Sequence, residues 1–318
     1  MKCAVLYFTQ TGNTEEVAKA IQKGIQETGS DCDLLRLRDA DPTRLYGYDL
    51  IGIGSPAFGV EPANVSKFIE DMRFVGGKHA FIFCTHGTHP ENFFPSIYPK
   101  VRDRELVVIG MANWYGNCYL LHMPEPYPTA GHPDEVDLQE AVQFGKDMVE
   151  RSRAVSGGDT SGIPAPPLPP PPPPADLPVG PNAHREEGER DVVERFSEML
   201  RFHKEKCRYP KCRLCMENCP VLGIDLSMDP PVLAEPCLMC EFCARVCPTG
   251  ALDIDEWVAA VAAETGTIFE RFLMSAIDQA ETEGKFRRLL PKEELKLDTY
   301  GYMVHTKHPS WIVGKGPR

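Results

Sequence analysis

The sequence predicts two domains, an α/β domain with a doubly wound, five-stranded parallel sheet and then a small α+β domain rich in cysteine. Three observations support this. Strand and helix signals alternate over the first half of the 318 residues, which is typical of a parallel sheet covered by helices. A proline-rich stretch then occupies residues 163–181. Finally, eight of the twelve cysteines gather between Cys207 and Cys247.

The α/β domain is predicted to span residues 1–155. Its strands are expected at five short apolar runs, residues 2–8, 33–37, 49–54, 79–85 and 105–111. Its helices are expected at residues 13–28, 62–74, 91–101 and 134–153, and Pro95 and Pro99 predict that the third is broken or short. Ligands of such sheets bind at the carboxyl ends of the strands, where the strand order reverses. The loops that follow the strands are therefore the expected binding loops.

The loop between the first strand and the first helix reads Thr9-Gln10-Thr11-Gly12-Asn13-Thr14. A helix N-terminus offers unpaired N–H groups and a partial positive charge, so this loop can enclose a phosphate without Lys or Arg. A P-loop would instead require Gly-Lys-Ser/Thr. An ordinary capping turn explains one or two hydroxyls, but not three threonines around Gly-Asn. The pattern therefore favours phosphate binding.

This loop resembles the Thr-x-Thr-Gly-Asn-Thr motif of the flavodoxin family, and the resemblance extends over residues 1 to about 152. It implies a flavodoxin-like fold that binds FMN, with the phosphate in the loop of residues 9–14. It also implies that two further loops border the flavin ring. These are Ser55-Pro56-Ala57-Phe58-Gly59 and Thr85-His86-Gly87. Phe58 is a candidate for stacking on the ring, with ordinary packing as the alternative, and Gly59 for a peptide that can turn over toward the flavin.

Two cysteine runs mark the second domain. Cys237-x2-Cys240-x2-Cys243-x3-Cys247-Pro248 follows Cys212-x2-Cys215-x3-Cys219-Pro220, and its last three cysteines lie 28 positions after those of the first run. Position 209, the counterpart of Cys237, is Tyr, so that Cys207 is the candidate with a Cys-x4-Cys spacing. Such runs hold 4Fe-4S clusters, with the fourth thiolate taken from the distant Cys-Pro. Paired Cys-x2-Cys runs also bind zinc, but the two Cys-Pro pairs favour iron–sulfur.

The segment resembles the bacterial two-cluster ferredoxins. Residues 185–318 are thus interpreted as a ferredoxin domain, with its cluster core at about 205–255, flanking helices and a C-terminal tail. The resemblance implies two 4Fe-4S clusters with crossed ligands. One set is Cys237, Cys240, Cys243 and Cys219, and the other is Cys207, Cys212, Cys215 and Cys247. The slipped Cys207 departs from the family spacing and leaves the first cluster to be tested.

Composition indicates a linker between the domains and limits the possible partners and location of the protein. Residues 156–184 are predicted to be a proline-rich linker, either a semi-rigid polyproline II spacer or a ligand of an SH3-like domain. The net charge of −12 argues against nucleic acid as a partner. No apolar run approaches the roughly 20 residues of a transmembrane helix. We find no signal peptide, and twelve cysteines without one are expected in a reducing cytoplasm.

The whole chain resembles the flavodoxin–ferredoxin fusion proteins of anaerobes. We therefore expect an electron-transfer protein that passes electrons between FMN, two 4Fe-4S clusters and a protein redox partner, and we assign no catalytic residue. Two alternatives stay open. One is a flavin-dependent reductase that acts directly on a small molecule such as a quinone. The other is a subunit of a larger redox complex that delivers electrons to activate an enzyme.

Overall fold

The computed structural model describes residues 1–73, 75–170, 192–228, 232–233, 237–268 and 273–295. The chain forms two compact units. The first is Met1–Asn117 with Gly131–Pro171, and the second is Cys118–Ala130 with Pro172–Arg318. The predicted first domain runs unbroken to residue 155, so the units differ from it at residues 118–130. The predicted linker from residue 171 onward and the C-terminal tail lie outside the described residues.

The first unit contains a five-stranded parallel sheet in the order β2-β1-β3-β4-β5. The strands are β1 (Lys2–Tyr7), β2 (Asp31–Arg36), β3 (Leu50–Pro56), β4 (His79–His86) and β5 (Val107–Tyr115). β1, β3 and β4 are almost continuously buried, as expected for strands covered on both faces. Two short 3₁₀ helices, Leu37–Asp39 and Pro42–Gly47, connect β2 to β3. The predicted doubly wound sheet is confirmed, and its strand order reverses between β1 and β3.

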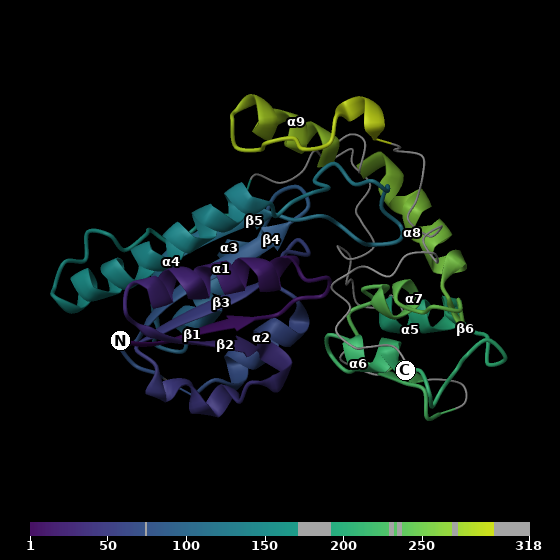
Figure 1. The fold of residues 1–318 in the computed structure, drawn as a ribbon, viewed down its shortest axis with the longest axis horizontal. Coiled ribbons are helices and arrows are strands. Elements are labelled where there is room, and N and C mark those ends of the chain that lie inside the picture. The colour runs from purple at the N-terminus through teal and green to yellow at the C-terminus, as the bar shows by residue number, and fades with distance from the viewer. Residues whose placement is uncertain (74, 171–191, 229–231, 234–236, 269–272, 296–318) are drawn as a thin grey trace. The chain divides into compact units, whose positions relative to one another are not determined.

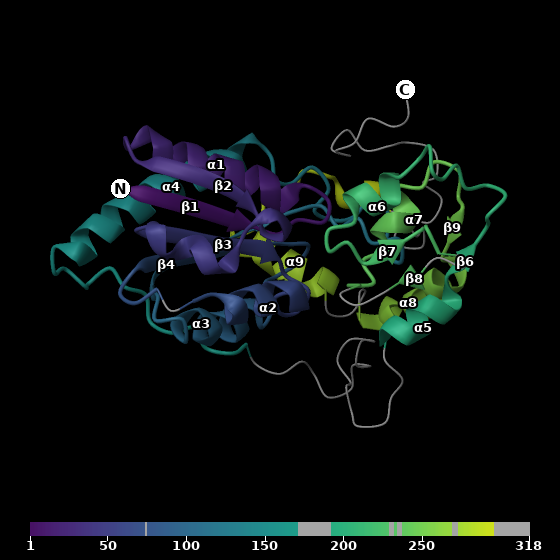
Figure 2. The same cartoon turned by 90° about the horizontal axis from the view of Figure 1, so that it is seen from below.

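Helices cover both faces of this sheet (Figure 1, Figure 2). α1 (Asn13–Glu27) and α4 (Glu135–Ser156) lie on one face, and α2 (Ala63–Asp71) and α3 (Phe93–Arg102) lie on the other. α1 and α4 approach closely through glycines. A Cβ atom added to Gly145 would lie 2.3 Å from the backbone oxygen of Ile21, and one added to Gly24 would lie 1.9 Å from that of Val142. No larger residue fits at either position without moving a helix.

The prolines of α3 do not break the helix. Pro95 falls in the first turn, where the backbone amides have no partner within a helix, so its missing N–H costs nothing there. Pro99 lies inside the helix and removes one backbone hydrogen bond. The helix nevertheless runs for ten residues, from Phe93 to Arg102.

The second unit repeats one small motif. α6 (Leu214–Asn218) and β7 (Ile224–Asp225) occur in the same order as α7 (Phe242–Arg245) and β9 (Leu252–Asp253), which begin 28 positions later. β7 pairs with β8 (Val232–Leu233) and β9 pairs with β6 (Arg201–Phe202), both antiparallel. The other elements are α5 (Val192–Met199), α8 (Asp255–Ile268), α9 (Met274–Thr282) and a 3₁₀ turn at Lys292–Glu294. The repeat in cysteine spacing is therefore also a repeat of structure.

Residues 118–130, which we call the inserted segment, leave the end of β5 and form part of the second unit. Leu121 is 4% exposed and packs in the hydrophobic core that contains Phe196 and Trp257. Arg245 of α7 donates to the carbonyl of Tyr119 at 2.9 Å and forms an ion pair with Glu125. The segment is thus held by both apolar packing and charge. None of the helices in the described parts of the chain is long and apolar enough to cross a membrane.

Candidate functional site

The loops predicted to bind a cofactor leave the same edge of the sheet. Because the strands are parallel and in register, the carboxyl ends of β1, β3, β4 and β5 meet there. Tyr7 pairs with Gly54, Pro56 with Thr85 and His86 with Tyr115. The loop after β1 therefore lies at the same edge as the loops after β3 and β4. This edge includes the point where the strand order reverses, which is the usual binding position in such folds.

The loop after β1 is shaped by Gly12, whose φ of +103° is rarely adopted by other residues. The Gly12 N–H donates to Thr9 Oγ1 at 3.0 Å. α1 begins at Asn13, and its N-cap residue, Gly12, has no side chain that could cap the first amides. A helix N-terminus after a tight glycine turn suits an anion. The backbone of this loop therefore fits a phosphate group.

Two side chains of the same loop are used within the fold. Thr14 is 1% exposed, and its hydroxyl lies 2.8 Å from that of Thr85 at the end of β4. The Asn13 amide donates to the carbonyl of Asn117, just beyond β5, at 2.8 Å. These bonds tie the loop to the neighbouring strands. Backbone N–H groups and the half-buried Thr11 are therefore better placed than Thr14 to contact a phosphate.

The loops after β3 and β4 contact each other. The Ala57 N–H donates to the carbonyl of Thr85, and the Asn92 N–H donates to that of Gly59, both at 2.9 Å. Gly59 has a φ of +78°, a value that glycine adopts without strain. This freedom is what the predicted turning over of the peptide at Gly59 would require. Phe58 is half-buried, so that part of its ring remains available for contact. The other predicted residues of these loops are Ser55, which is buried, and Pro56 and Gly87, which are half-buried.

His86, at the end of β4, is buried and serves the structure of the loop. Its Nε2 lies 2.8 Å from Asn113 Oδ1, and its ring centroid is 4.6 Å from that of Tyr115. Burial lowers the pKa of His86 to about 4. The imidazole is therefore neutral at neutral pH and does not act as an acid there. Trp114, on the adjoining β5, packs in the core against Phe83.

In the second unit, one cavity is lined by Cys207, Cys212, Cys215 and Cys247. Another is lined by Cys219, Cys237, Cys240 and Cys243. The structure thus brings the eight cysteines together in the same two groups that the crossed pattern predicts. Each cavity takes three thiols from one run and the Cys-Pro thiol from the other, except that Cys207 stands at the slipped position.

Backbone amides donate to the Cys-Pro sulfurs in the same way in both runs. The N–H group four residues further on is the donor, from Gly223 to Cys219 at 3.1 Å and from Ala251 to Cys247 at 3.2 Å. Burial opposes ionisation of Cys247, but amide and hydroxyl donors from residues 249–252 outweigh it and lower its pKa. These donors stabilise thiolates, which are the form that binds metal.

Cys207 has the local geometry of its counterpart despite the slipped spacing. The Tyr209 N–H donates to Cys207 at 3.4 Å, and the Met239 N–H donates to Cys237 at 3.5 Å, two residues further on in each case. Cys207 is half-buried and lines the first cavity. The Cys-x4-Cys spacing thus adds two residues between Cys207 and Cys212, but Cys207 still lines the same cavity as Cys212, Cys215 and Cys247.

Several of these thiols are deeply buried. Burial raises the pKa of Cys215 to about 12 and that of Cys243 well above the ordinary value. Such thiols ionise only when a bound cation compensates for the lost hydration, so metal binding and deprotonation are coupled. Four thiolates in one cavity are a ligand set for either a 4Fe-4S cluster or a zinc ion.

Comparisons with known proteins decide the family of the first unit. The sequence profile described as Flavodoxin matches residues 5–82. A flavodoxin of Clostridium beijerinckii is 30% identical over 146 residues, which cover 45% of this chain and 95% of that protein. This chain belongs to the flavodoxin family. A solved flavodoxin structure from the domain Archaea is 22% identical, with a TM-score of 0.38, and its alignment covers 48% of this chain and 99% of that one. Family membership supports FMN and electron transfer for the flavodoxin half.

A short segment of the chain is similar to ferredoxins. A ferredoxin of Methanothermococcus thermolithotrophicus is 35% identical over 54 residues, which are 16% of this chain and 90% of that protein. An uncharacterized ferredoxin of Methanocaldococcus jannaschii is 37% identical over 51 residues, 15% of this chain and 82% of that protein. The chain thus combines a flavodoxin half with a segment similar to ferredoxins, which supports iron–sulfur chemistry.

One charged residue of the second cavity is not predicted by any pattern in the sequence. Glu241 lies between Cys240 and Cys243, is 1% exposed and lines the cavity. Its carboxylate accepts hydrogen bonds from the Leu121 N–H and from Trp257 Nε1, and it lies 2.6 Å from His122 Nδ1. The glutamate is visible within the cysteine run, but two of these three partners come from the inserted segment. No local pattern could therefore have indicated its burial.

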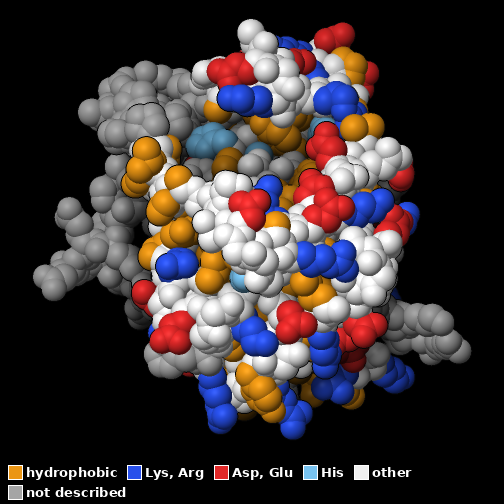
Figure 3. All heavy atoms as spheres, turned by 90° about the vertical axis from the view of Figure 1, so that its left-hand side faces the viewer, with side chains coloured by type: hydrophobic (Ala, Val, Ile, Leu, Met, Phe, Trp, Pro, Cys, Tyr) orange, Lys and Arg blue, Asp and Glu red, His pale blue; other side chains and the backbone are white. Residues whose placement is uncertain are grey.

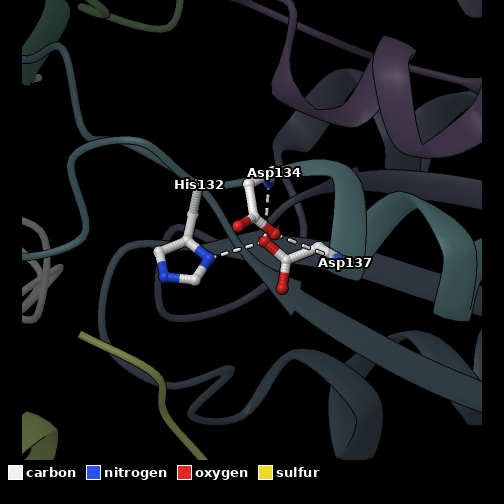
Figure 4. Close-up of side chains that lie close together, drawn as sticks. All are labelled: His132, Asp134 and Asp137. Carbon is white, nitrogen blue, oxygen red and sulfur yellow. Dashed lines mark hydrogen bonds and ion pairs between the residues drawn. The ribbon is translucent and has the colours of Figure 1, made fainter. Parts of the chain in front are cut away.

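In the flavodoxin half, His132, Asp134 and Asp137 lie together where α4 begins (Figure 4). The arrangement is a capping box. Asp134 Oδ1 accepts from the Asp137 N–H at 3.2 Å, and Asp137 Oδ2 accepts from the Asp134 N–H at 2.8 Å. His132 Nδ1 lies 2.6 Å from the same Asp137 oxygen. Capping of α4 accounts for these side chains, and we assign no metal to them.

Charges of both signs are interspersed on the face of the molecule shown in Figure 3. Ion pairs of the flavodoxin half follow the same pattern of close opposite charges, for example Lys19 with Glu15 and Lys146 with Glu27. Because such exposed pairs are screened by water and salt, each contributes little to stability.

Proposed function

We propose that this protein transfers electrons between FMN, bound in the flavodoxin half, two 4Fe-4S clusters, bound in the ferredoxin-like unit, and a protein redox partner. The observation that carries this proposal is the division of eight cysteines between two cavities, four in each. Zinc would also accept four thiolates. The crossed Cys-Pro ligands and the similarity to ferredoxins favour iron–sulfur. When bound, FMN exchanges one or two electrons and each cluster exchanges one.

The flavodoxin half holds FMN through its loops in this proposal. The N-terminal amides of α1 and the turn at Gly12 bind the phosphate. The loops of residues 55–59 and 85–87 border the flavin ring, with Phe58 as a stacking side chain. Because His86 is neutral and hydrogen-bonded to Asn113, it fixes the shape of the second of these loops.

In the ferredoxin-like unit, Cys207, Cys212, Cys215 and Cys247 hold one cluster and the other four cysteines hold the second. Amide donors such as Ala251 stabilise the thiolates. Thiolate ligands of iron–sulfur clusters persist where cysteines stay reduced, so we propose the cytoplasm of an anaerobic cell as the location.

Cofactor content tests the proposal directly. Iron, acid-labile sulfide and flavin are measured per chain on protein purified without oxygen, with EPR spectroscopy of the reduced form. We expect about eight irons, about eight sulfides and one FMN. Zinc in place of iron, or iron without sulfide, would overturn the cluster assignment. Four irons would restrict the proposal to one cluster.

A cysteine variant tests the crossed ligand sets. Cys219 lies in the first run but lines the second cavity. Cys219→Ser is therefore expected to remove or alter the cluster held by Cys237, Cys240 and Cys243, with about four irons retained. Cys32→Ser, a buried thiol on β2, is the control and keeps the full iron content. Selective damage to the cluster held by Cys212 and Cys215 would show that the ligands are not crossed.

A further inference from the structure

The two cavities of the second unit carry opposite charge. Among the described residues that line them, the first cavity has one charged residue, Arg208, and the second has one, Glu241. The cysteines are otherwise arranged alike in the two cavities, four thiols with similar amide donors. The charged residues are therefore the clearest electrostatic difference between two sites that a 28-residue repeat makes similar.

Glu241 is a deeply buried carboxylate with few opposing charges. It is 1% exposed, and two of its partners, the Leu121 N–H and Trp257 Nε1, are uncharged donors. Arg245, four residues further along the chain, forms an ion pair with Glu125. The remaining partner is His122, whose Nδ1 lies 2.6 Å from Glu241 Oε1. In a low dielectric, such a charge acts strongly on its surroundings.

The backbone conformation of Glu241 is also unusual. Its φ is +60°, an unusual value for a residue other than glycine. Such conformations persist where the surroundings fix them, and they cluster at functional sites. Here the three partners of the carboxylate supply that fixation.

The charge of Arg208 is exposed to solvent, unlike that of Glu241. Its side chain is exposed, as are those of its basic neighbours Lys204, Lys206, Lys211 and Arg213. Solvent and salt screen exposed charges over about 10 Å at ordinary ionic strength. The effect of Arg208 on the first cavity is therefore expected to be smaller than that of Glu241 on the second, and opposite in sign.

We propose that Glu241 lowers the reduction potential of the cluster in the second cavity and that Arg208 raises that of the cluster in the first. This inference rests on the proposed function, because it requires a cluster in each cavity. Reduction adds one electron, and thus one negative charge, to a cluster. A fixed negative charge nearby opposes that addition and a positive charge favours it. An electron in this unit is consequently more stable in the first cavity than in the second.

The test is a redox titration of the full-length protein with both cofactors, followed by EPR spectroscopy in the absence of oxygen. The wild-type protein is expected to show two distinct cluster potentials. Glu241→Gln is expected to move the lower potential toward positive values and to leave the higher one in place. Arg208→Gln is expected to move the higher potential, by a smaller amount, toward negative values. Glu256→Gln makes the same charge change at a side chain of this unit that is 53% exposed, and it should move neither.

Iron content separates failure of this inference from failure of the proposed function. Fewer than about eight irons in the wild-type protein would contradict the two-cluster proposal itself. If about eight irons are present and Glu241→Gln leaves both potentials unchanged, or moves only the higher one, the inference is wrong. If the Glu241→Gln protein loses iron, its potentials cannot be interpreted, and the Arg208→Gln protein tests the inference instead. A negative shift of the higher potential supports the charge assignment, and no shift overturns it.

Discussion

At the scale of a single residue, Gly12 determines the shape of the loop that we propose binds the phosphate. With a φ of +103°, it turns the chain so that its own N–H reaches Thr9, and as the N-cap of α1 it contributes no capping side chain. Any residue with a Cβ is strained in this region. The same glycine is therefore expected to affect both stability and phosphate binding, and a matched substitution can separate the two effects.

Gly12→Ala is expected to weaken FMN binding about ten- to hundredfold, the equivalent of one hydrogen bond to a charged group at about 1.5–3 kcal/mol. Alanine is strained at the φ of residue 12, and a backbone shift that relieves this strain would displace the N-terminal amides of α1 that we propose bind the phosphate. Flavin fluorescence titration of the apoprotein measures the affinity. Gly29→Ala is the control, because Gly29 has a φ of +77° with open space around it and lies outside the loop. Both variants should lose about 1 kcal/mol of stability, and equal losses of flavin affinity would contradict the role of Gly12.

His86 makes stability depend on pH. Its folded pKa of about 4 lies below its ordinary value of 6.5, so the unfolded chain binds the proton more readily. The stabilisation is present above pH 6.5 and is lost as the pH falls from about 6.5 to about 4. A shift of this size corresponds to at most about 3 kcal/mol in the free energy of unfolding.

His86→Gln is expected to flatten this dependence, because glutamine does not titrate. Urea unfolding, monitored through the release of flavin, measures the free energy of unfolding at neutral pH and near pH 4.5. The wild-type protein should lose more stability between the two values than the variant does. His203→Gln, in the other unit, controls for the removal of a histidine. Equal pH dependence of His86→Gln and the wild-type protein would contradict the burial argument.

At the scale of elements, the inserted segment shows how one loop can belong to a core that is distant in sequence. It leaves β5 of the flavodoxin half, yet Leu121 packs with Phe196 and Trp257 of the second unit. Glu241 and Arg245, one helical turn apart around α7, hold its backbone at Leu121 and Tyr119. The segment therefore supports the helix that lies between Cys240 and Cys247.

Leu121→Ala is expected to destabilise the second unit by about 2–5 kcal/mol, the usual cost of removing a buried leucine side chain. Iron loss during a temperature ramp should begin at lower temperature, whereas flavin release should change less. Leu168→Ala, at a side chain that is 87% exposed, is the control and should change neither. Earlier flavin release with unchanged iron loss would show that Leu121 serves the flavodoxin half instead.

At the scale of the whole molecule, the chain passes between its two units three times. It crosses after Asn117, again after Ala130 and a third time after Pro171. The proline-rich stretch is thus one connection among three. A long spacer alone would let two domains separate, but the inserted segment is part of the second core and remains covalently attached to β5 at one end and toward α4 at the other.

Cleavage of the proline-rich stretch therefore should not release the second unit. A protease site placed at residues 165–169 would divide the chain into two fragments, and the N-terminal fragment would still contain the inserted segment. We expect the fragments to co-elute in gel filtration without denaturant and to separate in urea. Separate elution under native conditions would show that the segment does not hold the two parts together. An uncut sample of the same protein is the control.

The sequence by itself determined the features that depend on neighbouring residues. Strand and helix periodicity predicted the doubly wound sheet, and the turn Thr11-Gly12-Asn13 is the basis on which a phosphate loop is predicted. The cysteine spacing predicted which four thiols meet in each cavity, because a short run with a fixed spacing brings its thiols together almost regardless of the rest of the chain. These signals are local, so one sequence is sufficient to interpret them.

Only the tertiary structure decided which predicted site side chains form hydrogen bonds within the fold, and which loop packs in which hydrophobic core. The Thr14 hydroxyl bonds to Thr85, 71 positions away, and the buried Glu241 carboxylate accepts from the Leu121 N–H, 120 positions away. Contacts at such separations come from packing of whole elements, and the residues involved have no common period or spacing. Burial and charge, which set the pKa of His86 and the environment of each cavity, therefore follow from the fold and not from the local pattern.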